Sequence, residues 1–152
     1  MIVSKFGGTS VADAEAIRRL IEIVRSRLHA HPVVVVSALA SVTDGLLDLA
    51  HMCGAGDGAA LEAAVAALLE RHEQVGRELP GCSAAIEAIA DDAEELRRDV
   101  VAACNRRLTP AEVDAVSGRG ELWSSRLVAS AMAAAGLDTA WVDIRPIMVT
   151  DG

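Results

Sequence analysis

The sequence predicts an α/β fold in which helices pack on a small, mostly parallel sheet. Short runs of β-branched residues alternate with long helical patterns, which is the order expected of βαβ units. One of these runs, Val33-Val34-Val35-Val36, shows no polar alternation. Apolar residues make up 52% of the chain but aromatic residues only 2%, and this balance favours helices on a small sheet over an aromatic-rich all-β fold.

The first βαβ unit is expected at the N-terminus. Residues 2–6 are predicted to form a short buried strand, and residues 11–28 a helix that Thr9 or Ser10 caps. The four valines are then expected to form a central parallel strand that is buried on both faces. A right-handed crossover is expected to join the two strands.

Five further helices are predicted at residues 46–52, 59–79, 84–107, 110–117 and 121–135. The second and third of these form an Ala-rich helical hairpin, because Pro80-Gly81 separates them as a turn. The fourth begins at Thr109-Pro110-Ala111-Glu112, which has the pattern of a capping box with proline in the first turn.

The C-terminal residues are expected to return to the sheet. Residues 139–144 are predicted to form a third strand and residues 147–149 the start of a fourth, before a turn at Thr150-Asp151-Gly152. No internal repeat or low-complexity linker divides the 152 residues, so a single domain with a substantial core is expected.

Composition and charge argue against several classes of protein. The net charge of -8 disfavours broad attraction to nucleic acid or to anionic membranes, although it leaves room for a local basic pocket. The three cysteines form no Cys-x-x-Cys pair, so free thiols in a reducing cytosol are expected. No apolar run reaches the ~18 residues that span a bilayer, and no signal peptide is expected at the N-terminus.

The stretch Lys5-Phe6-Gly7-Gly8-Thr9-Ser10 connects the first strand to the first helix. Glycines let the backbone approach a ligand closely, N–H groups at a helix N-terminus favour phosphate, and Lys5 adds a positive charge. The stretch matches neither a P-loop nor Gly-x-Gly-x-x-Gly. Two interpretations remain open, an anion site or an ordinary tight turn with a surface lysine.

The turn after the valine run is a second candidate. It offers the hydroxyl groups of Ser37 and Thr43 beside the small residues Ala38 and Ala40. Neighbouring parallel strands end at the same edge of a sheet, so this turn is expected to share a crevice with the first one. The alternative is a plain capped helix start, with Ser41 or Thr43 as the cap.

Glu121 is a third candidate, at a glycine-flanked helix start. It either presents a carboxylate to the ammonium group of a ligand or stabilises the helix through its dipole. Trp123 is expected in the core rather than over a ligand. His72 begins a His-Glu-x-x-His zinc pattern, but Gly76 stands where the second ligand belongs, so no metal site is predicted.

Taken together, the three turns resemble the amino-acid kinase family, and within it the aspartokinases. Lys5-Phe6-Gly7-Gly8-Thr9-Ser10 is similar to the N-terminal signature of aspartokinases, and the valine run with the turn that follows it is similar to the family's second glycine- and alanine-rich turn. Gly120-Glu121-Leu122-Trp123-Ser124 resembles the family's Gly-Glu-x-x-Ser helix start. Asp143-Ile144-Arg145 and Thr150-Asp151-Gly152 match the strand that follows.

The resemblance implies a three-layer sandwich with a mostly parallel sheet. Residues 1–152 would form its N-terminal, amino-acid-binding part, with the helical hairpin inserted. The implied reaction is transfer of the γ-phosphate of ATP, with Mg²⁺, to the β-carboxylate of L-aspartate, the first step toward lysine, threonine and methionine. A cytoplasmic homo-oligomer is implied. The family's kinase domain is considerably longer than this chain, so the chain alone is expected to be inactive.

The resemblance also implies a role for each candidate residue. The catalytic residue is Lys5. The phosphate-binding residues are Lys5, Gly7, Gly8 and Ser10, and the substrate-binding residues are Ser37, Ala38, Thr43 and Glu121. Two alternatives stay open: another amino-acid or nucleotide-monophosphate kinase of the same fold, and a binding or assembly module without catalysis.

Overall fold

The computed structural model describes residues 1–147. In this range the elements follow in the order β1 (Ile2–Phe6), η1 (Gly8–Val11), α1 (Ala14–Ser26), η2 (Leu28–Ala30), β2 (Pro32–Val36), α2 (Val42–Met52), α3 (Gly58–Arg77), α4 (Ser83–Ala102), α5 (Pro110–Ser117) and α6 (Arg119–Ala134). Apart from Ile147, which lies in a turn, the predicted fourth strand and the turn at Thr150-Asp151-Gly152 fall outside the described residues.

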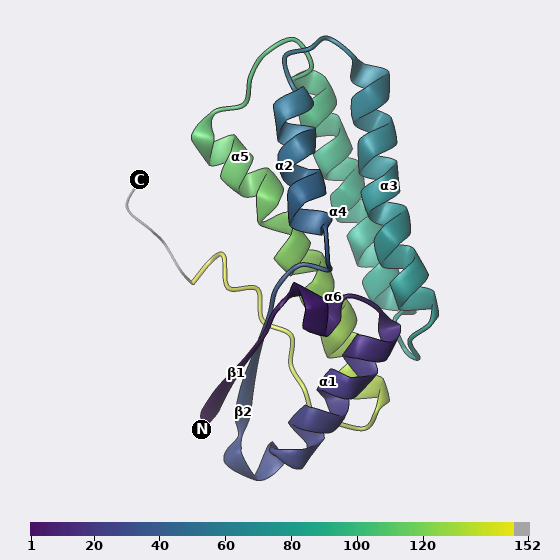
Figure 1. Ribbon diagram of the computed structural model, residues 1–152, viewed down its shortest axis with the longest axis vertical. Helices are drawn as coiled ribbons and strands as arrows, with labels where there is room; N and C mark the ends of the chain where they lie inside the picture. The colour runs from purple at the N-terminus through teal and green to yellow at the C-terminus, as the bar shows by residue number, and fades with distance from the viewer. Residues whose placement is uncertain (148–152) are drawn as a thin grey trace.

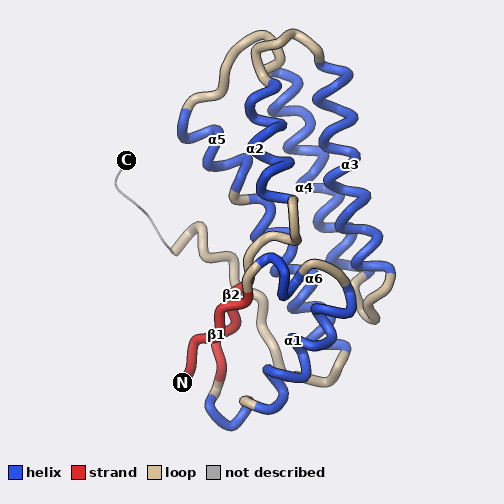
Figure 2. The backbone as a smooth tube through the Cα atoms, viewed as in Figure 1, coloured by secondary structure: helices blue, strands red, loops and turns tan. Residues whose placement is uncertain are grey.

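The two strands pair in parallel, with α1 between them in the chain (Figure 1). Val3 is opposite Val33 and Lys5 is opposite Val35. The backbone tube in Figure 2 shows how small the sheet is beside the helices. The predicted α/β class and the first βαβ unit are therefore confirmed.

The prediction that the valine strand is buried on both faces is wrong for the described residues. Phe6, Val34 and Val36 pack into the core. Val3, Val33 and Val35 belong to the other face, and their exposed fractions are 63%, 45% and 44%. Side chains alternate along a strand, and in the described part of the chain the core lies on one face only.

The first helix begins later than predicted. Gly8–Val11 forms a short 3-10 helix, and the α-helix starts after it at Ala14. The cap is Asp13 instead of Thr9 or Ser10, and its carboxylate accepts a hydrogen bond of 2.8 Å from the N–H of Ala16. An aspartate at this position also suits the positive end of the helix dipole.

Helices α3 and α4 form the predicted hairpin and stand side by side in Figure 1. At its tip Gly81 adopts a left-handed conformation with φ of 74°. A Cβ atom there would lie 2.6 Å from the Cβ of Ala134 at the end of α6, so only glycine fits this turn. The hairpin tip is thus packed against the end of α6.

Helix α4 ends at Ala102, five residues earlier than predicted. The carbonyl of Cys104 accepts hydrogen bonds from the N–H groups of Gly54 and Gly56, at 2.9 and 2.8 Å. The loop that contains Gly54 and Gly56 thus takes up a carbonyl group that a longer α4 would use within the helix. The predicted capping box, formed by Thr109 and Glu112, is present in full at the start of α5.

Two other helices also differ in their boundaries. Helix α2 begins at Val42, four residues earlier than predicted, directly after Ser41, whose φ is 67°. Helix α6 begins at Arg119, two residues earlier than predicted. Both differences concern the candidate residues, because Thr43 lies in the first turn of α2 and Glu121 in the first turn of α6.

Residues 139–144 do not form the predicted third strand. A strand needs a partner for its backbone groups, and the described sheet contains only β1 and β2. Side chains anchor the segment instead. The indole N–H of Trp141 donates to the hydroxyl of Ser125 at 3.0 Å, and the guanidinium of Arg126 lies 4.1 Å from the centre of the Trp141 ring.

The core lies among the helices and the covered face of the sheet. Its largest fully buried side chains include Trp123, Ile17, Leu20, Leu39, Leu46, Leu49, Leu61, Ile89, Leu96 and Leu127. None of the helices in residues 1–147 combines the length and the apolar character needed to cross a membrane.

Candidate functional site

The site begins with Lys5, near the end of β1. Its side chain is exposed, and its ammonium group donates a hydrogen bond of 3.0 Å to the hydroxyl of Ser37. The ladder between the strands continues one step further, because the N–H of Ser37 donates to the carbonyl of Phe6 at 3.0 Å. Lys5 is also the only lysine in the chain, whose other cationic side chains at neutral pH are arginines. The predicted meeting of the first two turns is therefore present.

The backbones of these two turns are in close contact. A Cβ atom added to Gly8 would lie 3.3 Å from the carbonyl oxygen of Ala38. The first turn is closed by a hydrogen bond of 2.8 Å from the N–H of Ser10 to the carbonyl of Gly7. Gly8 thus permits the close approach of the two turns, while the predicted approach of a ligand to these glycines stays a prediction.

Glu121 joins the site from the first turn of α6. One of its carboxylate oxygens accepts a hydrogen bond from the N–H of Ala38 at 3.3 Å, across 83 residues of sequence. The helix comes so near that a Cβ atom on Gly120 would lie only 2.7 Å from that of Ala38. A carboxylate and an ammonium group therefore both bind the short turn Ser37-Ala38.

Ser124 is a residue of this site to which sequence reasoning assigned no role. It is buried, and its hydroxyl donates a hydrogen bond of 2.8 Å to the carbonyl of Ser37. It lies three residues after Glu121, on the same side of α6. That spacing is the signal in the sequence that could have identified it.

Two predicted site residues are not joined to this group. Ser10 is exposed in η1, and Thr43 is exposed in the first turn of α2. In residues 1–147 no side-chain hydrogen bond connects either hydroxyl with Lys5, Ser37 or Glu121. Their expected roles in ligand binding stay predictions.

Trp123 is confirmed as a core residue. Its ring is fully buried and meets the ring of His72 edge-on, with 5.0 Å between the ring centres. It lies on α6 two residues after Glu121, so it belongs to the opposite side of the helix. It therefore packs in the core on the side of α6 that faces away from Glu121 and does not cover a ligand.

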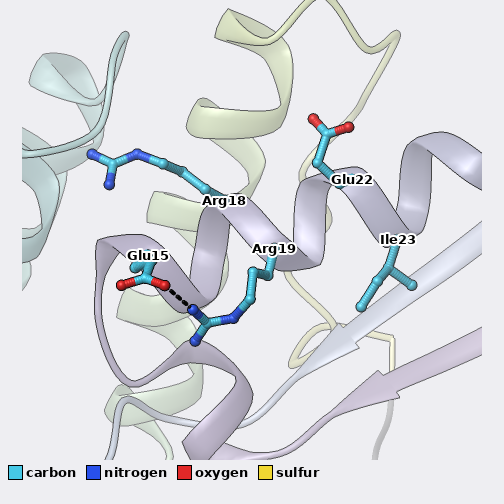
Figure 3. A pocket seen from close by; sticks show the side chains of 5 residues that line it. All are labelled: Glu15, Arg18, Arg19, Glu22 and Ile23. Atoms are coloured by element: carbon cyan, nitrogen blue, oxygen red, sulfur yellow. Dashed lines mark hydrogen bonds and ion pairs between the residues drawn. The ribbon is translucent and has the colours of Figure 1, made fainter.

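A hollow on the outside of α1 is separate from this site (Figure 3). All of its lining residues come from that one helix, and two of them, Glu15 and Arg19, form an ion pair with each other. Residues 1–147 contain no group of three or more His, Cys, Asp or Glu side chains that could hold a metal ion.

Nearly the whole sequence matches the profile of a known protein family. Residues 1–151 fit the sequence profile of the Amino acid kinase family. The chain belongs to this family. The predicted resemblance is thereby confirmed for the family as a whole, and it extends over nearly the whole chain.

Named members of the amino acid kinase family show the same similarity. The chain is 33% identical over 151 residues to the chloroplastic bifunctional aspartokinase/homoserine dehydrogenase 1 of Arabidopsis thaliana. The aligned region covers 97% of this chain and 16% of the plant protein. The chain is also 32% identical over 162 residues to the lysine-sensitive aspartokinase 3 of Escherichia coli, covering 99% of this chain and 32% of that protein. The chain thus spans a third or less of these relatives.

The fold agrees with that of a solved member of the amino acid kinase family. E. coli aspartokinase III, solved in complex with aspartate and ADP, matches 97% of this chain with a TM-score of 0.86 and 30% sequence identity. The match covers 32% of the E. coli chain. The α/β arrangement described above is therefore that of part of an aspartokinase fold.

Proposed function

We propose that residues 1–152 form the amino-acid-binding part of a kinase domain, and that the protein transfers the γ-phosphoryl group of ATP to the β-carboxylate of L-aspartate. One observation carries the proposal. Lys5 and Glu121, which lie far apart in the sequence, both bind the turn Ser37-Ala38 at the end of a parallel strand. The aspartokinase of similar fold was solved with aspartate and ADP, which supports this choice of substrates.

The chemistry suits this arrangement. The side chain of aspartate has an ordinary pKa of about 3.9, so the nucleophile is already ionised at neutral pH and needs no general base. The enzyme then has to align the reactants and neutralise charge. Lys5 stabilises the negative charge of the transferring phosphoryl group. The backbone N–H groups of Gly7 and Gly8 and the hydroxyl of Ser10 bind phosphate oxygens.

The amino-acid substrate binds at the side of the Ser37-Ala38 turn that Glu121 contacts, and the phosphate binds at the side that Lys5 contacts. Glu121 binds its ammonium group, while Ser37, Ala38 and Thr43 line the pocket. Mg²⁺ would accompany ATP and would supply further positive charge to the phosphates. Substrate ammonium and nucleotide phosphate therefore meet opposite charges supplied by this chain.

We also place the full-length protein in the cytoplasm, as a homo-oligomer. The three cysteines are free, and two of them are buried, which fits a reducing compartment. Sedimentation of the full-length protein measures the oligomeric state.

The reaction is tested by trapping its product. The full-length protein is incubated with Mg-ATP, L-aspartate and hydroxylamine, which converts an acyl phosphate into a hydroxamate. Hydroxamate that depends on both aspartate and ATP supports the proposal. If glutamate or a nucleotide monophosphate is phosphorylated and aspartate is not, the protein is a different kinase of the same fold.

Replacing Lys5 by alanine tests the proposed catalytic residue. Loss of a cation that stabilises the transferring phosphoryl group should lower kcat about 10²- to 10³-fold. Lys5 is exposed, so the circular dichroism spectrum and the melting temperature should stay close to those of the unmodified protein. Arg19→Ala, which removes an exposed cation from α1, serves as the control and should leave kcat unchanged. A kcat of Lys5→Ala near the normal value would exclude this role.

A further inference from the structure

Asp92, in helix α4, is a carboxylate that the candidate site does not include. Its side chain is 16% exposed and has two partners, both from α6. The helical hairpin and the first turn of α6 therefore meet at this acidic group. Figure 1 shows α4 and α6 as neighbours, in agreement with their contacts.

The first partner is Arg119, at the start of α6, whose side chain is 13% exposed. Its guanidinium pairs with the carboxylate of Asp92 at 2.8 Å and donates to the backbone carbonyl of the same residue at 2.9 Å. One nitrogen of the guanidinium, Nη1, makes both contacts, while the other, Nη2, lies 3.6 Å from the carboxylate of Asp99, also in α4. The start of α6 is thus joined to α4 through the side chain of Arg119.

The second partner is Trp123, one helical turn further on. Its indole N–H donates to the carboxylate of Asp92 at 2.6 Å, and its buried ring rests against His72 of α3. Arg119 and Trp123 are four residues apart, so they lie on one side of α6. The first turn of α6 is therefore bound to the hairpin at both of its ends, through Arg119 and through Trp123.

The other side of this turn carries the candidate site. Glu121 is two residues from Arg119 and two from Trp123, which places it on the opposite side of α6. From there it reaches the N–H of Ala38, and Ser124 reaches the carbonyl of Ser37. Any rotation of the turn that releases the hairpin contacts also moves these two site contacts.

We propose that Asp92 is a positioning residue for the amino-acid site, acting through Arg119 and Trp123 on Glu121. The inference rests on the proposed function, since it gives Asp92 a role in binding the same substrate. A buried ion pair often stabilises a protein no better than a hydrophobic pair of similar volume. What this pair supplies beyond hydrophobic packing is a defined orientation of α6.

The test uses Asp92→Asn in the full-length protein. Asparagine keeps the shape and one acceptor for Trp123 but removes the nearer of the two carboxylates that pair with Arg119, leaving Asp99 at 3.6 Å. The KM for aspartate should rise about tenfold or more, because small displacements of binding groups are costly, while the KM for Mg-ATP changes less than about twofold. Asp91→Asn, at the exposed neighbouring position, is the control and should change neither constant.

A double-mutant cycle separates positioning from a general structural role. If Asp92 acts through Glu121, adding Asp92→Asn to Glu121→Gln should raise the KM for aspartate less than about twofold further. The proposal would be overturned if the effects of the two substitutions on the KM for aspartate multiplied in the double variant. It would also be overturned if Asp92→Asn lowered the melting temperature and left the KM unchanged. Arg119→Gln, which removes the charge that pairs with Asp92 and keeps a polar side chain, replaces Asp92→Asn if that variant does not fold.

A second measurement does not depend on catalysis. In ¹⁵N-labelled full-length protein, Asp92→Asn should shift the amide resonances of Ser37 and Ala38, and Asp91→Asn should leave them in place. Unshifted resonances in Asp92→Asn contradict the proposal. If the unmodified protein makes no aspartyl phosphate, the proposed function fails. The NMR measurement still decides in that case whether Asp92 orients the first turn of α6 against Ser37 and Ala38.

Discussion

At the scale of single residues, His72 is a buried base with an unusual environment. Its Nδ1 lies 2.7 Å from the carbonyl of Leu68, which can only accept, so this nitrogen carries the proton. Its Nε2 is buried and has no partner within residues 1–147. Burial lowers the pKa of His72 from 6.5 to about 4, the nearby Arg71 adds to this, and the Leu68 carbonyl opposes it. The folded protein therefore keeps this ring neutral.

The lowered pKa of His72 predicts acid sensitivity. Between pH 6.5 and about 4 the unfolded chain binds a proton that the folded chain does not, so the free energy of unfolding falls as the pH falls. The loss across this window should be about 3 kcal/mol. Urea unfolding at a series of pH values measures it, and His72→Phe should lack this part of the pH dependence.

His51, exposed on α2, provides the matched control for this measurement. His51→Gln removes an exposed histidine in place of the buried one and should follow the pH dependence of the unmodified chain. Equal pH dependence of His72→Phe and the unmodified chain would show that folding does not lower the pKa of His72.

At the scale of elements, the closeness of α6 to the Ser37-Ala38 turn depends on Gly120. A methyl group there would lie 2.7 Å from the Cβ of Ala38 and 3.3 Å from side-chain carbons of Leu46 and Val42. The Cβ of Ala38 is attached directly to the backbone and cannot rotate away. Any larger residue at position 120 therefore has to push the helix and the turn apart.

Gly120→Ala is expected to damage both stability and the site. Overpacking should lower the free energy of unfolding by about 1–3 kcal/mol, which chemical denaturation measures. In the full-length enzyme the KM for aspartate should rise at the same time, because Glu121 moves with the helix start. Gly58→Ala is the control, since a methyl group there would meet only Val101 at 3.9 Å. Equal stability of the two variants would contradict this account of the contact.

At the scale of the whole molecule, the described residues leave one face of the sheet uncovered. Val3, Val33 and Val35 form an apolar surface there, and Lys5 lies on the same face beside Val35. An exposed group of β-branched residues on a short parallel sheet favours association. The outer face of the sheet is thus where the 152-residue chain should bind a second copy of itself.

Replacing the three valines by threonine tests this expectation. Threonine keeps the β-branched shape but carries a hydroxyl, so the dissociation constant for self-association of the 152-residue chain should rise about tenfold or more. Sedimentation velocity over a range of concentrations measures it. Serine at the exposed positions Ala63, Ala66 and Ala67 of α3 is the control and should have no effect. A 152-residue chain that stays monomeric at high concentration would refute the prediction.

The sequence by itself determined the local features of this protein. The capping box at Thr109, the hairpin turn at Pro80-Gly81 and the parallel pair of strands around α1 are present as predicted. Each depends on residues that are near one another in the chain, or on a hydrophobic pattern strong enough to define a strand. The same local patterns identified Lys5, Ser37, Ala38 and Glu121 as candidates for one site.

Only the tertiary structure decided which distant groups meet. The contact of Glu121 with Ala38 spans 83 residues, and the orientation of α6 depends on Asp92 in the hairpin. The valine run indicated a strand but not what covers it, and residues 139–144 had strand-like composition but no partner. Burial and strand pairing are properties of neighbours from elsewhere in the chain, so a local pattern predicts the element and leaves its surroundings open.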